Sequence, residues 1–166
     1  MNIDQLLYNI KEQGVSYLTK EDRKNIINIA VCCLEEQINK SGLQIKSSDE
    51  ASDYLKLQFA NEVNEVFSVL FLNNNNKFIA FEKLFFGTIN QSIVFPRVVL
   101  KKALELDAAA VIFAHNHPGG NKEPSSNDIK ITKELSKILS IVDVKVLDHL
   151  VVAGNECVSF AEERLL

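Results

Sequence analysis

The sequence predicts an α/β protein in which helices flank a mixed β-sheet. Apolar runs of strand length alternate along the chain with amphipathic segments of helical length. Two of the apolar runs are separated only by four asparagines, Asn73–Asn76, which favours a hairpin between antiparallel strands. Strand–helix alternation combined with one hairpin is typical of a layered α/β fold with a mixed sheet.

Composition excludes several classes of protein. The chain has 166 residues, of which 46% are apolar and 24% charged, enough for a domain with a sizeable core. The net charge of −4 and the lack of a Lys/Arg stripe argue against strong nucleic-acid binding. No stretch approaches the ~20 apolar residues of a membrane span. Three cysteines, Cys32, Cys33 and Cys157, fit no disulfide framework, so we expect reduced thiols and a cytoplasmic protein.

Residues 1–42 are expected to form an N-terminal helical hairpin, followed by a second domain over residues 43–166. The apolar positions of the first helix are Ile3, Leu6, Leu7 and Ile10. Thr19 and Asp22 have the spacing of a capping box at the start of the second helix. Gly42 marks its end. The apolar faces of this hairpin must pack on the rest of the chain or on a partner.

The second domain holds the predicted sheet. Its expected elements are a helix to about residue 60, strands over 65–72 and 77–86, a short strand at 93–95, a helix from Pro96, a strand over 107–114, a helix from Ser125, and strands over 144–152 and 157–160. The runs over 65–72 and 107–114 are almost entirely apolar, which indicates strands buried on both faces.

Three residues near the end of one predicted strand can form a metal site. His115 and His117 are two residues apart, so in extended geometry both imidazoles point the same way. Asp128, in the first turn of the next helix, can bring a carboxylate to the same point. Three protein ligands with an open fourth position are the arrangement of a catalytic zinc. Ser125 and Asp128 also have capping-box spacing, which explains those two residues without any metal.

Two further polar residues stand in predicted strands. Alternation places Glu82 on one face with Phe78, Ala80 and Leu84. If that face is covered, desolvation would raise the pKa of Glu82, which suits a general base; on an open face the carboxylate would simply be solvated. His149 is either a hydrogen-bond partner of a ligating histidine or a packed strand residue.

The string His-x-His-Pro followed by Ser-x-x-Asp resembles the JAMM (MPN-plus) metalloprotease motif, and its surroundings resemble the RadC family. The matching segments are Glu82–Thr88, Phe95–Arg97, Ala103–Ala110 and Val146–Leu150. The resemblance covers roughly residues 43–164 and implies a cytidine-deaminase-like α/β fold. It implies that Zn²⁺ is held by His115, His117 and Asp128. It further implies that Glu82 activates the zinc-bound water and that Ser125 helps to hold the oxyanion.

The function implied by the resemblance is a zinc-dependent hydrolase that cleaves a peptide or isopeptide substrate. One alternative is a non-catalytic binding module in DNA repair or mobile-element biology. A metal-dependent nuclease is a third reading, which the acidic charge balance disfavours because a nuclease must attract a polyanion. RadC proteins often carry a helix-hairpin-helix DNA-binding module, but residues 1–42 are too short for it and lack its glycine-rich turn.

Overall fold

The computed structural model describes residues 3–41, 47–87 and 94–166. Its helices are α1 (Ile3–Gln13), the short 3-10 helix η1 (Val15–Tyr17), α2 (Lys20–Ser41), α3 (Ser48–Phe59), α4 (Pro96–Glu105) and α5 (Ser126–Ser140). Its strands are β1 (Val66–Leu72), β2 (Phe78–Phe86), β3 (Ala110–Asn116), β4 (Lys145–Ala153) and β5 (Glu156–Ser159). The five strands form one sheet in the order β2-β1-β3-β4-β5. Only β3 and β4 run parallel, so the sheet is mixed and the predicted α/β fold class is confirmed.

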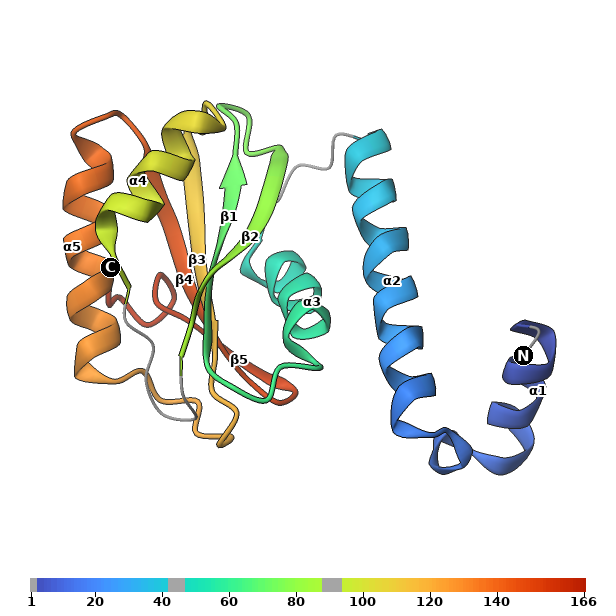
Figure 1. The fold of residues 1–166 in the computed structure, drawn as a ribbon. Helices are drawn as coiled ribbons and strands as arrows, with labels where there is room; N and C mark the ends of the chain where they lie inside the picture. Colours follow the sequence, from blue (N-terminus) through green and yellow to red (C-terminus); the bar gives the residue numbers. More distant parts are fainter. Residues whose placement is uncertain (1–2, 42–46, 88–93) are drawn as a thin grey trace.

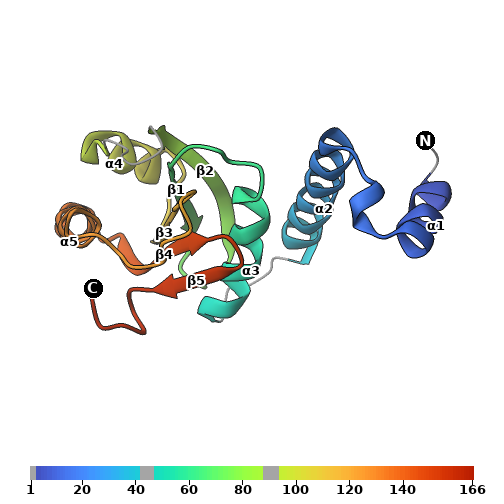
Figure 2. The same cartoon turned by 90° about the horizontal axis from the view of Figure 1, so that it is seen from below.

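The sheet lies between two layers of helices. Helix α3 covers one face, and α4 and α5 cover the other (Figures 1 and 2). On the α3 side, Leu55 packs against Leu70 and Ile112 of the central strands. On the opposite side, Leu135 and Leu139 of α5 pack against Phe113 and its neighbours. Strands β1 and β3 are buried along their whole length, because both of their faces contact helices.

Strand β3 is longer at its carboxyl end than the sequence predicted. It runs through Asn116, so His115 lies inside the strand rather than in the following loop. The positive φ of 49° at Asp107 marks a turn before the strand, which delays its start to Ala110. The short strand expected at 93–95 falls partly outside the described residues, and Val94 and Phe95 are not in a strand.

The N-terminal helices lie on the α3 side of the sheet. Helix α2 contacts α3, and η1 joins α2 to α1 (Figure 1). The predicted capping box is present, since the Asp22 N–H donates to Thr19 Oγ1 and the Thr19 N–H donates to Asp22 Oδ2, both at 3.1 Å. The division of the chain near residue 42 remains a prediction. Within residues 3–41, 47–87 and 94–166, no helix combines the length and apolarity that a membrane crossing requires.

Candidate metal centre

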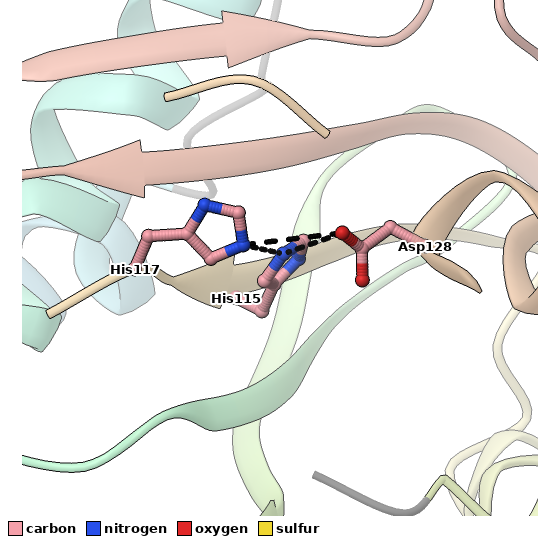
Figure 3. A group of neighbouring side chains, drawn as sticks. All are labelled: His115, His117 and Asp128. Atoms are coloured by element: carbon pink, nitrogen blue, oxygen red, sulfur yellow. Dashed lines mark hydrogen bonds and ion pairs between the residues drawn. The ribbon is translucent and has the colours of Figure 1, made fainter. Parts of the chain in front are cut away.

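The carboxyl end of β3 and the amino end of α5 bring three potential metal ligands together. The side chains of His115, His117 and Asp128 point toward one another (Figure 3). The two histidines share a direction because they are two residues apart at the end of an extended strand. The chain then turns back through the loop between β3 and α5, which places the first turn of α5 beside them. His115 is buried, while His117 and Asp128 are partly exposed.

The distances between the ligand atoms fit a single ion. His115 Nε2 lies 2.9 Å from His117 Nε2, and Asp128 Oδ2 lies 3.6 and 3.9 Å from these two nitrogens. The point equidistant from the corners of this triangle is about 2.0 Å from each atom, within the range of zinc–nitrogen and zinc–oxygen bonds. Among the described residues these three form the group able to hold a metal ion.

Capping of α5 orients the carboxylate ligand. The Ser125 N–H donates to Asp128 Oδ2 at 2.7 Å, and the Asp128 N–H donates to Ser125 Oγ at 3.1 Å, which completes a capping box. The capping and ligand interpretations of Asp128 are therefore compatible, because the same oxygen that caps the helix faces both histidines. Burial raises the pKa of the Asp128 carboxyl, but its hydrogen bond and charge interaction with His115 and its bonds to Ser125 outweigh burial. The net shift is downward, so the carboxylate is ionised at neutral pH.

Comparison with known proteins gives the family. The profile of the RadC-like JAB domain family matches residues 45–165. The chain belongs to this family. A UPF0758 protein of Cellvibrio japonicus is 54% identical over 123 residues, which are 74% of this chain and 55% of that relative. A UPF0758 protein of Methylibium petroleiphilum is 54% identical over 120 residues, or 72% of this chain and 54% of the relative.

The RadC-like domain accounts for most of the match in each case. The chain spans about half the length of the Cellvibrio and Methylibium relatives. By contrast, UPF0758 protein YkfG of Escherichia coli K12 is 44% identical over 149 residues, which are 90% of this chain and 94% of YkfG. These names identify a family and describe no reaction, so the chemistry has to be argued from the site itself.

Backbone and side-chain acceptors fix the orientation of both histidines in this RadC-like domain. His117 Nδ1 lies 2.5 Å from the Asn121 carbonyl oxygen, which can only accept, so Nδ1 carries the proton and Nε2 presents a lone pair. His115 Nδ1 lies 2.8 Å from Nε2 of His149, and His149 Nδ1 lies 2.6 Å from Thr132 Oγ1. Burial lowers the pKa of His149 well below its usual value, so the ring is neutral at pH 7. His149 therefore contacts a candidate ligand directly, which the sequence had left open.

Glu82 lies on the same face of the sheet as His115 but two strands away. It pairs in register with Val69 of β1, which pairs with Phe113 of β3, two residues before His115. Its carboxylate forms an ion pair with Lys102 of α4, with Oε1 and Nζ 2.8 Å apart. The side chain is 37% exposed, so the carboxylate is partly solvated, and of the two environments that the sequence left open the fully desolvated one is not observed. Its catalytic role stays a prediction.

A second carboxylate lies closer in register to the ligands, and sequence reasoning did not single it out. Glu65 directly precedes β1, two residues before Phe67, which pairs with His115. Extending this antiparallel register by two residues sets Glu65 opposite His117 and on the same face. The signal in the sequence was an acidic residue at the head of a buried apolar run.

Asn116 ties the residues around Glu65 to the end of β3. The Val66 N–H donates to Asn116 Oδ1 at 2.7 Å, and Asn116 Nδ2 donates to the Asn64 carbonyl oxygen at 2.9 Å. Asn116 stands between the two histidines, and alternation turns its side chain away from them. The contiguous His-Asn-His string thus supplies two candidate ligands and one side chain that links the end of β3 to the start of β1.

Proposed function

We propose that this RadC-like domain is a zinc-dependent hydrolase of peptide or isopeptide bonds, with the metal held by His115, His117 and Asp128. The observation that carries the proposal is the single point about 2.0 Å from all three ligand atoms. Two imidazole nitrogens and one carboxylate oxygen are a donor set that suits catalytic zinc and leaves one position open.

The residues around this point match the needs of amide hydrolysis. Zinc bound there would supply Lewis acidity, lowering the pKa of a water to about 7 and polarising a carbonyl. His115 and His117 present lone pairs at Nε2, and Asp128 contributes one negative charge in a partly buried position. The Ser125 hydroxyl, exposed at the amino end of α5, is proposed to donate a hydrogen bond to the oxyanion of the tetrahedral intermediate.

A carboxylate must also take a proton from the attacking water and return it to the leaving amine. The resemblance to JAMM proteins nominated Glu82, which shares the sheet face of His115. Its carboxylate is engaged in an ion pair with Lys102, with Oε1 and Nζ 2.8 Å apart, and would have to leave that partner to act on a water. Register favours Glu65, because extending the β1–β3 pairing by two residues sets it opposite His117. We therefore place Glu65 first and keep Glu82 as the competing assignment.

The metal is tested by zinc analysis of the purified chain beside its His117→Ala variant. We expect about one zinc per wild-type chain and a large loss in the variant, because two ligands hold the ion far less tightly than three. Circular dichroism checks that the variant is folded. A wild-type chain that takes up no zinc at neutral pH would remove the basis of the proposal.

The base is tested by comparing Glu65→Gln and Glu82→Gln on a panel of peptide and isopeptide substrates. Glutamine keeps the size of the side chain and removes the basic oxygen. The variant of the true base should retain zinc and lose about 10²–10⁴-fold in rate. Glu105→Gln is a matched control, since Glu105 is exposed and pairs with Lys101 of the same helix, α4. If both variants stay fully active, neither glutamate is the base.

The peptide or isopeptide substrate and the cytoplasmic location are also proposals. Cys32, Cys33 and Cys157 are free thiols in the structure, as a reducing cytoplasm would keep them. If zinc-loaded wild-type protein cleaves nothing in a broad screen of peptides and isopeptides, the non-catalytic binding module becomes the better hypothesis.

A further inference from the structure

A chain of hydrogen bonds leads away from one candidate ligand and ends at another. It begins at His115 Nδ1, passes through both ring nitrogens of His149, and continues to the Thr132 hydroxyl at 2.8 and 2.6 Å. Thr132 Oγ1 then donates to the backbone carbonyl of Asp128 at 2.6 Å. These groups come from β3, β4 and α5, and the three linking side chains are all buried.

The donor and the acceptor of each hydrogen bond in this series follow from the last acceptor, the backbone carbonyl oxygen of Asp128. A carbonyl oxygen can only accept a hydrogen bond, so the Thr132 hydroxyl donates its single proton to the backbone carbonyl oxygen of Asp128. Thr132 Oγ1 must then accept from His149, which places the His149 proton on Nδ1. A neutral His149 has its lone pair at Nε2 and accepts from His115 Nδ1. His115 therefore carries a proton on Nδ1, and the Nε2 lone pair of its neutral ring is available to a metal ion at the point between His117 Nε2 and Asp128 Oδ2. Without a metal, the 2.9 Å contact between the two Nε2 atoms needs a shared proton.

The surroundings of His149 hold this arrangement in place. The ring lies among Phe67, Phe113 and Phe160, with centroid distances of 5.6, 5.8 and 4.5 Å. Aromatic walls on several sides prevent the imidazole from turning over, and they keep water from offering an alternative hydrogen-bond partner. Packing alone would be satisfied by an apolar side chain of similar size, whereas here both ring nitrogens have partners of defined polarity.

We propose that His149 and Thr132 are positioning residues that hold His115 in the tautomer with its proton on Nδ1 and a free lone pair at Nε2. The inference rests on the proposed function in one respect, because the metal ion that would bind this lone pair is the zinc of the proposed hydrolase. The expected contribution is the 10–100-fold in metal affinity that outer partners of ligating histidines commonly provide.

Thr132→Val and Thr132→Ser form a matched pair that separates this role from packing. Valine keeps the shape of threonine without the hydroxyl, so His149 Nδ1 loses its acceptor. The favoured tautomer of His149 then reverses, its Nε2 donates to His115 Nδ1, and the His115 proton moves to Nε2. We expect Thr132→Val to bind zinc about 10–100-fold more weakly in chelator competition, and Thr132→Ser to stay within about threefold of wild type. A packing role gives the opposite ranking, because serine loses a buried methyl group and valine does not.

The tautomers are read directly by ¹⁵N NMR of the imidazoles in metal-free protein. The wild type should show His115 Nδ1 protonated, and Thr132→Val should lower the protonation of this nitrogen. An unprotonated His115 Nδ1 in the wild type would overturn the proposal, as would equal zinc affinities in wild type and Thr132→Val. Neither measurement needs a substrate, so a wild type that has the Nδ1 tautomer and binds zinc but cleaves nothing would count against the hydrolase proposal alone.

Discussion

Replacing Asn116 by alanine should destabilise the protein far more than its position between two metal ligands suggests. The substitution removes the acceptor of the Val66 N–H and the donor to the Asn64 carbonyl. Val66 is fully buried, so its orphaned N–H keeps a desolvation penalty of about 1–3 kcal/mol. The second hydrogen bond adds about 0.5–1.5 kcal/mol. The expected loss in free energy of unfolding is therefore about 1.5–4.5 kcal/mol.

Urea unfolding of the metal-free wild type, Asn116→Ala and Asn155→Ala measures this loss. Asn155 lies in the exposed turn between β4 and β5, so its substitution should change the free energy of unfolding by less than about 0.5 kcal/mol. The midpoint of thermal unfolding should fall by roughly 2–4 °C per kcal/mol for Asn116→Ala.

Hydrogen exchange locates the effect. In Asn116→Ala the Val66 amide should exchange faster by a larger factor than the amide of Leu70, in the middle of β1, because the clamp acts at the head of the strand. A change below 0.5 kcal/mol in unfolding, or uniform acceleration along β1, would refute the view that Asn116 pins this strand to β3.

Three further predictions follow from charge and burial. The lowered pKa of Asp128 stabilises the folded state above the unfolded-state pKa of about 3.9, and this contribution is lost as the pH falls toward the folded-state pKa. Asp128→Asn should therefore be less stable than wild type in metal-free urea unfolding at pH 7, and the gap should narrow by pH 3. Burial raises the pKa of the Cys157 thiol, whereas Cys32 and Cys33 are exposed, so Ellman's reagent at pH 8 should label two thiols quickly and Cys157 slowly. The net charge of −4 predicts weak DNA binding, and fluorescence anisotropy with duplex DNA at physiological salt should show no tight complex.

The sequence was most informative where one segment carries its own signal. The capping positions Thr19 and Ser125 each precede a helix in the structure, and each accepts the expected hydrogen bond from a residue three positions later. The metal ligands also lie close together in the chain, because a strand end, a turn and a helix start suffice to assemble them. Both kinds of feature depend on local geometry, which residue spacing records directly.

Alternation failed where the register of β2 shifts. Phe78 was expected to share a face with Ala80 and Leu84, but it packs on the α3 side, while the other two pack on the opposite side. The β1–β2 pairing has irregularities between Phe67 and Ser68 and between Phe71 and Leu72. Each such irregularity changes which residues face a given helix layer, and the sequence itself contains no signal that predicts it.

The environment of Glu82 could not be decided from the sequence, for a different reason. Lys102 comes from α4, twenty positions along the chain, and its ion pair with Glu82 depends on how that helix crosses the sheet. The place of Glu65 likewise depends on β1 pairing with β3 rather than with β2 alone. Such contacts arise from tertiary packing, so a single sequence cannot rank the two glutamates.

The candidate metal centre thus combines two kinds of residue. The candidate ligands are close together in the sequence, whereas the residues that contact them come from distant segments. His115, His117 and Asp128 fall within one strand–turn–helix unit, so their residue types and spacing in the sequence are enough to predict a metal site. Asn116, Thr132 and His149 give no such sign. We propose that their hydrogen bonds to β1, to the Asp128 carbonyl and to His115 hold the candidate ligands in place. A RadC-like chain that keeps the three ligands but replaces Thr132 by valine should therefore look complete by its motif and still bind zinc poorly.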